Sequence, residues 1–348
     1  MARAVTVSEG VFPAGDGPEQ VAPDVWRIPL PLPFALRSMN AYLLGSPAEG
    51  WTLVDSGLGL AADEAALIAG LDAAGVVVEA IGSIVLTHAH PDHIGLSGWV
   101  AAASGAPITM LEGEDQALFR VWDPDGDMEV WDALSAMYAA QGLTPEQVGN
   151  VRAITERIRH VLRLPPREAV RTVRDGETLR LGDHDYRIIW TPGHSDHHMV
   201  LLRDDGLLLA GDHVLPHITP NIGWYPYNRP NPLQDYYESL AKVRDLPATL
   251  VLPGHGRPFA DLAGRADELR AHHEERAAEV RAIVAAAAPN SAGVTAARVA
   301  RALFGDRLRN DDDRRFALVE CLAHLEHLRL AGQLARDERD GIVAYSLA

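Results

Sequence analysis

Three histidines and one aspartate lie within six residues of one another in the segment Thr87-His88-Ala89-His90-Pro91-Asp92-His93-Ile94-Gly95. The segment follows Ser83-Ile84-Val85-Leu86, a short apolar run typical of a β-strand. The end of this strand therefore delivers four ligand-type side chains to one loop: His88, His90, Asp92 and His93. Neutral imidazole and carboxylate groups are the ligands that Zn(II) and similar cations prefer. A single histidine is usually a core or surface residue, but four such side chains in one loop predict a metal site.

Three later segments repeat the arrangement of an apolar strand, a glycine and a ligand-type residue. The ligand-type residues are His194, Asp212 and His255, and each directly follows a glycine. Glycine lets the backbone turn sharply and approach a site closely. Together with the first loop, these segments supply five histidines and two aspartates at strand ends, a set that suits two metal ions.

Strand and helix patterns alternate over most of the chain, which favours an α/β layered fold. Strands are predicted at 25–28, 41–44, 51–54, 84–86, 107–110, 178–181, 186–190, 199–202, 207–210 and 249–252. Helices are predicted at 63–74, 94–104 and 232–245.

The same patterns predict how the chain divides. Residues 1–20, rich in Gly, Pro and small residues, form a loose arm, and residues 21–261 form the catalytic domain. Within that domain, residues 111–165 form a helical insertion, placed to make a lid or one wall of a pocket. A dimer surface or a cover for the sheet are the alternatives for this insertion. A helix over 262–291 then links the catalytic domain to residues 292–348.

The C-terminal unit combines two predicted helices, 295–303 and 315–331, with two short strands, 334–337 and 342–345. Helices followed by such a hairpin resemble a winged helix. Residues 293–348 hold nine arginines and nine acidic residues, so the unit carries no net basic charge. Direct reading of DNA normally requires a basic face, which makes a DNA-binding role a minor alternative.

Bulk composition is that of an ordinary globular protein, with 47% apolar and 23% charged residues among 348. The apolar stretches are too short to span a membrane, and the N-terminus has no apolar run of signal-peptide length. Cys321 is the single cysteine, which excludes an internal disulfide. We therefore expect a cytoplasmic protein without a membrane partner, with a homo-oligomer as one option.

The net charge of −17 opposes attraction to a phosphate backbone over most of the surface. It does not exclude a nucleic-acid substrate, because two bound divalent cations add four positive charges locally. The charge therefore favours a small-molecule substrate over a nucleic acid.

The order of the motifs between about Ala41 and Gly256 resembles that of the metallo-β-lactamase-fold hydrolases, a superfamily with a four-layer αββα sandwich. The resemblance implies one metal held by His88, His90 and His194, a second held by Asp92, His93 and His255, and Asp212 bridging both. It also implies that Asp55 lies behind the ligands and orients them. The segment Ile218-Thr219-Pro220-Asn221, the insertion and the C-terminal unit are similar to the lactamase-β-2-like subgroup. Some relatives there cleave RNA and others are uncharacterised hydrolases, so the subgroup does not fix the substrate.

The expected chemistry follows from charge. Two divalent ions roughly 3.5–4 Å apart can share a hydroxide that acts as a nucleophile at neutral pH. Asp92 is the residue expected to orient this nucleophile or to move a proton. Zn(II) is the expected metal, although Fe and Mn suit the same ligands. The prediction is a dinuclear hydrolase of a small ester, thioester or lactone; the alternatives are an endoribonuclease or phosphodiesterase of the same fold and a DNA-binding regulator.

Substrate contacts are expected in the long Pro-rich, aromatic loop after Asp212. Its candidates are His217, Asn221, Tyr225 and Tyr227. The alternative for the aromatic residues is that they only pack the loop against the domain.

Overall fold

Apolar strands, the central ones buried along nearly their whole length, build two β-sheets in the computed structural model, which describes residues 17–33, 36–126, 128–287 and 293–348. Neighbouring strands of the first sheet are, in order, β1 (Glu19–Ala22), β2 (Val25–Pro31), β3 (Ser38–Ser46), β4 (Gly50–Val54), β5 (Ile81–Val85), β6 (Ile108–Leu111) and β7 (Val170–Val173). The second sheet has the order β12 (Leu250–Pro253), β11 (Leu207–Gly211), β10 (Met199–Arg203), β9 (His184–Trp190) and β8 (Thr178–Leu181).

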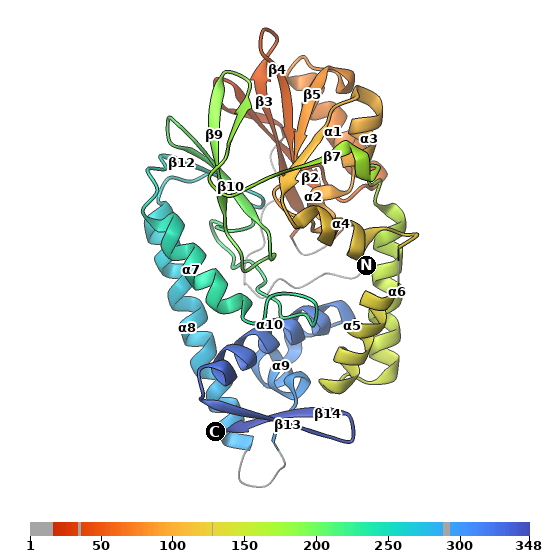
Figure 1. Cartoon of the computed structure of the whole chain (residues 1–348), viewed down its shortest axis with the longest axis vertical. Coiled ribbons are helices and arrows are strands. Elements are labelled where there is room, and N and C mark those ends of the chain that lie inside the picture. The colour runs from red at the N-terminus through yellow and green to blue at the C-terminus, as the bar shows by residue number, and fades with distance from the viewer. Residues whose placement is uncertain (1–16, 34–35, 127, 288–292) are drawn as a thin grey trace.

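The two sheets pack face to face, with helices on both outer faces (Figure 1). The inner layer joins Tyr42 and Val54 of the first sheet to Ile188 and Leu209 of the second in one buried cluster. Helices α1 (Ala61–Ala73) and α3 (Ser97–Ser104) cover the first sheet, and α7 (Pro232–Arg244) with the start of α8 (Leu262–Ala287) covers the second. This arrangement confirms the predicted αββα sandwich.

The remaining helices are α2 (Pro91–Ile94), α4 (Glu114–Trp122), α5 (Glu129–Ala140), α6 (Pro145–Val161), α9 (Ala296–Phe304) and α10 (Asp311–Leu330). Short 3-10 turns are η1 (Val78–Ala80), η2 (Arg167–Ala169) and η4 (Gly305–Arg307). A hairpin of β13 (Leu334–Arg339) and β14 (Ile342–Leu347) ends the chain. No helix within the described ranges is both long and apolar enough to cross a membrane.

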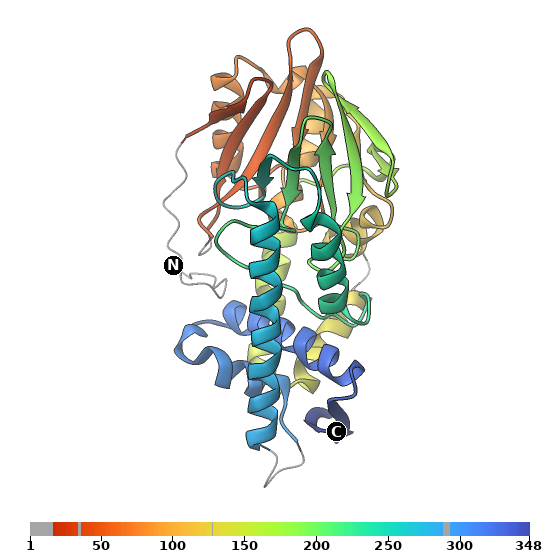
Figure 2. The same cartoon turned by 90° about the vertical axis from the view of Figure 1, so that its left-hand side faces the viewer.

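The insertion and the C-terminal unit share one hydrophobic core. Trp131 and Tyr138 of α5 belong to the same buried cluster as Val280 of α8, Val299 of α9 and Leu322 of α10. We call this assembly of α5, α6, the second half of α8, α9, α10 and the hairpin the helical body. Helix α8 runs from the sandwich along the helical body (Figure 2). Helix α5 and the first part of α6 therefore pack on the C-terminal unit, whereas α4 packs on the first sheet, a division that local sequence patterns did not reveal.

Several element boundaries differ from the sequence prediction. Strand β1 begins at Glu19, inside the predicted arm, whose residues 1–16 lie outside the described part of the chain. The linking helix predicted over 262–291 extends to Ala287, and residues 288–292 are likewise outside. Helix α10 begins at Asp311 rather than at 315, because the Asn310 side chain accepts a hydrogen bond from the backbone N–H of Asp313.

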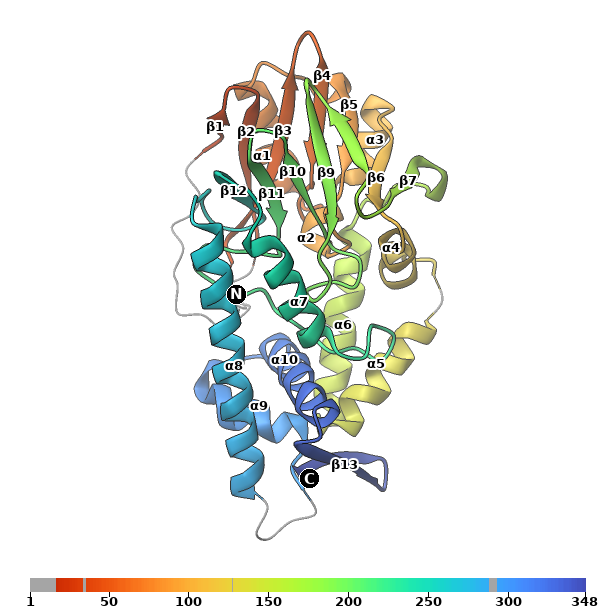
Figure 3. The same ribbon diagram turned by 60° about the vertical axis from the view of Figure 1, so that its left-hand side comes forward.

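The strands that carry ligand-type residues end at one edge of the sandwich. Strands β4 and β5 are parallel, and β10 runs antiparallel to both β9 and β11, while β12 is parallel to β11. The carboxyl ends of β9, β11 and β12 therefore lie together, and Figure 3 shows β9 and β11 pointing toward the helical body. The loops that follow these strands meet between the sandwich and the helical body.

Candidate metal centre

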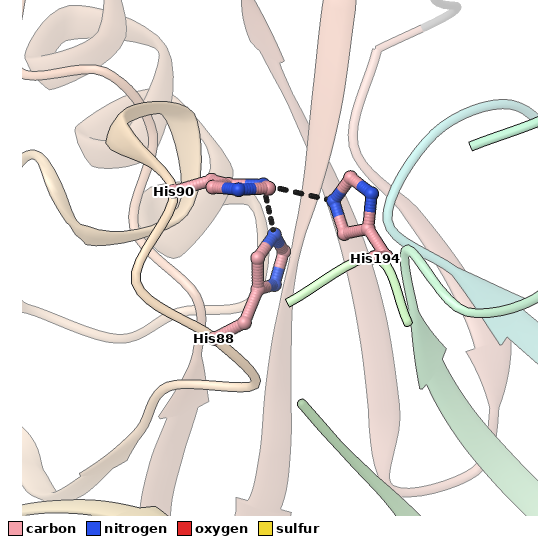
Figure 4. A group of neighbouring side chains, drawn as sticks. All are labelled: His88, His90 and His194. Carbon is pink, nitrogen blue, oxygen red and sulfur yellow. Dashed lines mark hydrogen bonds between the residues drawn. The ribbon is translucent and has the colours of Figure 1, made fainter. Parts of the chain in front are cut away.

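The first ligand group consists of three imidazoles that converge from two loops. His88 and His90 follow β5, and His194 follows β9 (Figure 4). Nδ1 of His90 lies 3.0 Å from Nε2 of His88 and 2.8 Å from Nε2 of His194. Tetrahedral ligation at about 2.0–2.1 Å from each nitrogen requires ligand separations of roughly 3.3 Å. The three nitrogen atoms are therefore close to the spacing that one zinc-sized ion needs.

The second group joins Asp92 and His93, from the same loop, to His255 after β12. Oδ2 of Asp92 lies 3.3 Å from Nε2 of His255 and 3.9 Å from Nε2 of His93. All ligand atoms of this group lie within 4.8 Å of one another.

Asp212 lies between the two groups. Its Oδ2 is 3.3 Å from Nε2 of His255 and 3.5 Å from Nε2 of His194, and its Oδ1 is 3.5 Å from Nε2 of His93. One carboxylate thus reaches histidines of both groups. The structure therefore brings together all seven residues proposed from the sequence as metal ligands.

Hydrogen bonds to backbone carbonyls fix the orientation of two of these imidazoles. Nδ1 of His194 donates to the carbonyl of Asn221 at 3.0 Å, and Nδ1 of His255 donates to the carbonyl of Ser38 at 2.9 Å. Because Nδ1 carries the proton in each ring, the Nε2 lone pair is left to face the centre. This is the usual way in which proteins select the tautomer of a metal-ligating histidine.

Asp55 performs the same task for the loop after β5. Its Oδ2 accepts hydrogen bonds from Nδ1 of His93 at 2.8 Å and from the hydroxyl of Thr87 at 2.9 Å. Its Oδ1 accepts from the backbone N–H of Thr87 at 2.9 Å. The Thr87 oxygen in turn lies 3.0 Å from Nδ1 of His88. Asp55, buried directly after β4, thus orients one imidazole of each ligand group, the position that the family resemblance implied for it.

Burial and charge divide the histidines into two kinds. Burial lowers the pKa of His88 well below its usual value and lowers that of His90 to about 3, so both rings are neutral. Burial also disfavours the charged form of His255, but the carboxylates of Asp212 and Asp92 outweigh it and raise its pKa to about 10. The same two carboxylates, with Asp55, raise the pKa of His93 well above its usual value. The carboxylates therefore attract positive charge to the second group, which protons or a cation can supply.

Two buried atoms support a cation rather than protons alone. Nε2 of His93 and Oδ1 of Asp212 make no hydrogen bond within the described part of the chain, although they lie 3.5 Å apart. Buried polar atoms without a partner are uncommon in native structures. Imidazole nitrogens and carboxylate oxygens aimed at one point fit a divalent cation of the zinc, iron or manganese kind.

The glycine before His255 is required by the crowding at the centre. A Cβ atom on Gly254 would lie 2.2 Å from Oδ1 of Asp212 and 2.9 Å from Cε1 of His93. Both separations are far below van der Waals contact, so any side chain here would displace the ligands. The close backbone approach inferred from the sequence is thus present at this position.

Glu114, at the start of α4, is a site residue that the sequence did not indicate. It is buried, and its Oε1 accepts hydrogen bonds from the backbone N–H of Ala89 and the hydroxyl of Ser195, both at 2.6 Å. Ala89 lies between two ligands and Ser195 follows a third. Burial raises the pKa of Glu114 to about 7. No local spacing pattern could reveal a carboxylate that acts on two distant loops.

We expect Glu114→Ala to lower both metal affinity and turnover by about 10- to 100-fold, the usual effect of removing a group that supports metal ligands. The substitution leaves the Ala89 N–H and the Ser195 hydroxyl without their acceptor, so both ligand loops lose a fixed point. Bound metal measured by elemental analysis, together with steady-state kinetics, tests this. Glu114→Gln keeps an acceptor oxygen and should lose much less; equal losses in both variants would contradict this role.

One cavity of about 360 Å³ connects the ligands to the helical body. On the sandwich side it is lined by His90, Asp92, His194, Asp212 and His255. On the other side it is lined by six aromatic residues, which we call the aromatic chamber: Trp122, Trp131, Tyr138, Tyr225, Tyr227 and Phe316. The insertion thus forms one wall of a pocket, and α10 contributes to it.

Three of the four residues proposed from the sequence to contact substrate line the cavity, and the fourth does not. Asn221, Tyr225 and Tyr227 line the cavity. His217 is exposed and is not among the lining residues. Asn221 also connects the ligands to the C-terminal unit, because its carbonyl holds His194 while its Nδ2 lies 3.4 Å from the carbonyl of Phe316.

Glu320 of α10 is a further carboxyl group in the cavity wall, and burial raises its pKa from 4.5 to about 7. The native carboxyl keeps its proton up to about pH 7, whereas the unfolded chain releases it near pH 4.5. Between these values the unfolded state binds fewer protons, so the native state loses stability as the pH rises. Below the lower value this loss is absent.

We therefore expect the unfolding free energy of the native protein, relative to Glu320→Gln, to fall by about 3 kcal/mol between about pH 4 and pH 8. Denaturant unfolding of both proteins at several pH values measures this difference, and groups common to both cancel. Glu338→Gln, at an exposed position, serves as the control for removal of a surface carboxyl group. A pH-independent offset between Glu320→Gln and the native protein would contradict the raised pKa.

Comparison with known proteins agrees with the fold. The metallo-beta-lactamase superfamily model matches residues 36–255, and the metallo-beta-lactamase-like C-terminal domain model matches residues 281–348. The crystal structure of a metallo-beta-lactamase family protein from Thermus thermophilus is 34% identical, with a TM-score of 0.82 over 94% of this chain and 100% of that one.

Curated relatives carry names of related kinds. A probable metallo-hydrolase of Bacillus subtilis is 28% identical over 81% of this chain and 85% of its own length. The beta-lactamase-like protein 2 homolog of Caenorhabditis elegans is 28% identical over 72% of this chain and 66% of its own length. The atrochrysone carboxyl ACP thioesterase of Aspergillus fumigatus is 28% identical over 64% of this chain and 51% of its own length. The fold, the converging ligands and these matches together show that the chain belongs to the metallo-beta-lactamase superfamily and is a metallo-hydrolase with that superfamily's C-terminal domain.

Proposed function

We propose that the chain hydrolyses small acyl thioesters, or related esters and lactones, with two divalent cations held by the two ligand groups. The observation that carries the proposal is one cavity that joins the candidate ligands to the six aromatic residues of the aromatic chamber. Pockets of this size and lining accommodate small organic molecules. The thioesterase name of one relative supports the same class of substrate.

The proposed chemistry is an addition of water to an acyl carbonyl. When bound, divalent cations would lower the pKa of a water molecule and polarise the carbonyl oxygen of the substrate. A C–O bond to the water oxygen forms and the C–S bond to the leaving thiol breaks, which gives a carboxylic acid and a thiol. No oxidant or reductant is needed.

Asp92 is the proposed proton carrier. Its side chain is 20% exposed and lines the cavity, while His93 is fully buried. Burial raises the pKa of Asp92, but His93 and His255 outweigh burial and lower it to about 2. An ionised Oδ2 facing the cavity can accept a proton from the attacking water and return it to the departing thiolate.

The two alternatives from the sequence receive less support. Every residue of α10 from Ala317 to Glu326 is buried, whereas a helix that enters a DNA groove needs an exposed face. The net charge of −17 and the aromatic lining of the cavity also suit a polyanionic substrate poorly.

A metal-reconstitution experiment tests the proposed function. Chelated protein is loaded with Zn(II), Fe(II) or Mn(II) and assayed on thioesters, lactones, aryl esters, a phosphodiester and single-stranded RNA. We expect metal-dependent turnover of thioesters or esters, lost in Asp92→Asn. Turnover of RNA alone would replace the proposal by a nuclease, and duplex DNA binding without any turnover would replace it by a regulator.

A further inference from the structure

The walls of the aromatic chamber come from separate parts of the chain. Trp122 ends α4, Trp131 and Tyr138 lie on α5, Tyr225 and Tyr227 belong to the loop before α7, and Phe316 lies on α10. Their rings pack in ordered pairs. Trp122 and Trp131 meet edge to face with centroids 6.0 Å apart, and Tyr225 and Tyr227 are stacked at 5.9 Å and 13°.

A backbone hydrogen bond and burial hold these walls in position. The backbone N–H of Trp224 donates a hydrogen bond to the backbone carbonyl of Val319 at 3.0 Å, which connects the loop to α10. Trp131 and Tyr138 are buried in the core of the helical body. Side chains that are already fixed lose little entropy when a substrate enters, so the chamber can discriminate between substrate shapes.

The chamber also contains side chains with polar groups. Tyr138, Tyr225 and Tyr227, which line the cavity, each carry a hydroxyl group. Arg315, which also lines the cavity, is held by Asp312 through contacts of 2.7 and 3.1 Å. Burial raises the pKa of the Tyr138 and Tyr225 hydroxyl groups, and the charge of the Arg315 guanidinium partly offsets this rise. These hydroxyl and guanidinium groups can donate hydrogen bonds to oxygen atoms of a substrate.

Exposure along the cavity indicates which part of a thioester the chamber takes. Trp131 and Tyr138 are buried, whereas Gln116 and Arg120 of α4 line the same cavity and are exposed. A thiol carrier is long and must reach solvent, so its natural path runs past α4. The acyl group is the part that remains for the buried side.

Resting on the proposed function, we propose that the aromatic chamber binds the acyl group of the substrate and selects aromatic acyl groups with oxygen substituents. Flat rings can pack against the paired aromatic walls, and the substituent oxygens can accept hydrogen bonds from the donors of the chamber. The insertion and α10 are then specificity elements of the hydrolase.

Thioesters that share one thiol, N-acetylcysteamine, test this with the metal-loaded full-length protein. The acyl groups are acetyl, octanoyl, naphthoyl and hydroxynaphthoyl. We expect kcat/KM to be highest for hydroxynaphthoyl and at least about tenfold above octanoyl, given the size of aromatic contacts. Octanoyl turnover equal to or above that of both aromatic acyl groups would overturn the proposal.

Variants locate the selectivity in the chamber. Trp131→Leu and Phe316→Leu should each lower the ratio of hydroxynaphthoyl to acetyl kcat/KM about 3- to 10-fold. Phe304→Leu is the matched control, because Phe304 is buried in the helical body but does not line the cavity. A ratio that changes equally in all three variants would overturn the proposal.

Binding separates failure of this inference from failure of the proposed function. If neither these thioesters nor the esters and lactones of the reconstitution experiment are hydrolysed, the proposed function is wrong. Calorimetric binding of hydroxynaphthoic acid, compared with acetate, then tests whether the chamber binds aromatic acyl groups. Tighter binding than acetate that Phe316→Leu weakens supports the aromatic site. No binding beyond that of acetate overturns it.

Discussion

Replacing Asp212 by alanine should lower turnover by at least about 10³-fold and remove metal from both ligand groups. The reason is geometric, because Asp212 is the carboxylate whose oxygens lie 3.3–3.5 Å from His194, His93 and His255. Loss of a ligand common to both groups removes several kcal/mol of transition-state stabilisation, which corresponds to this factor in turnover. Metal stoichiometry by elemental analysis and kcat/KM on the best substrate measure the effect.

A substitution confined to the second group distinguishes a shared ligand from an ordinary one. Asp92→Ala should reduce the bound metal by about half, since the group of His88, His90 and His194 stays complete. The exposed Asp185→Ala, on β9 but away from the ligands, should leave metal content and turnover unchanged. Full metal occupancy in Asp212→Ala would show that Asp212 is not shared between the groups.

The substitution Asp55→Asn should lower metal affinity about 10- to 100-fold and destabilise the fold by about 1–3 kcal/mol. The three hydrogen bonds that Asp55 accepts come from Thr87 and His93. An amide replaces one acceptor oxygen by a donor, so one donor faces another donor. If His93 responds by moving its proton to Nε2, that nitrogen no longer binds a metal. Competition with a chromophoric chelator and denaturant unfolding measure the two effects.

The backbone makes asparagine the informative substitution at this position. Asp55 has φ of 60°, a conformation that asparagine adopts more readily than most residues, so the loss is attributable to the side chain. Asp340, in the exposed turn between β13 and β14, is the other non-glycine residue with positive φ in the described ranges. Asp340→Asn is therefore the matched control and should change neither quantity. Unchanged metal affinity in Asp55→Asn would exclude the orienting role.

The insertion and the C-terminal unit share one core, and together they form a wall of the cavity. Helices α5 and α10 supply chamber residues only because the core around Leu322 holds them opposite the ligands. A protein that lacked residues 292–348 would therefore lose part of its cavity wall and much of the core of the helical body. The proposed selectivity for the acyl group depends on that wall.

The candidate ligands were identifiable from the sequence, because each follows an apolar strand and lies next to a glycine or near another candidate ligand. Strand ends of one α/β layered fold meet at a common edge, so local patterns placed His88, His194, Asp212 and His255 near one another. The position of Asp55 behind them was implied by resemblance alone. Hydrogen bonds to Thr87 and His93 then account for it physically.

Features that depend on packing between distant segments were not predictable in this way. Glu114 joins loops that are 25 and 81 residues away in the sequence, and no periodicity encodes such a contact. The aromatic residues of the insertion were indistinguishable from ordinary core residues until the helical body placed them along the cavity. The local sequence shows the type of each candidate ligand and, through the apolar pattern of the strands, its position at a strand end. The pocket forms where surfaces from distant segments of the chain meet. A candidate metal site is therefore readable from the order of the residues, and the cavity that leads to it depends on how the sandwich and the helical body pack together.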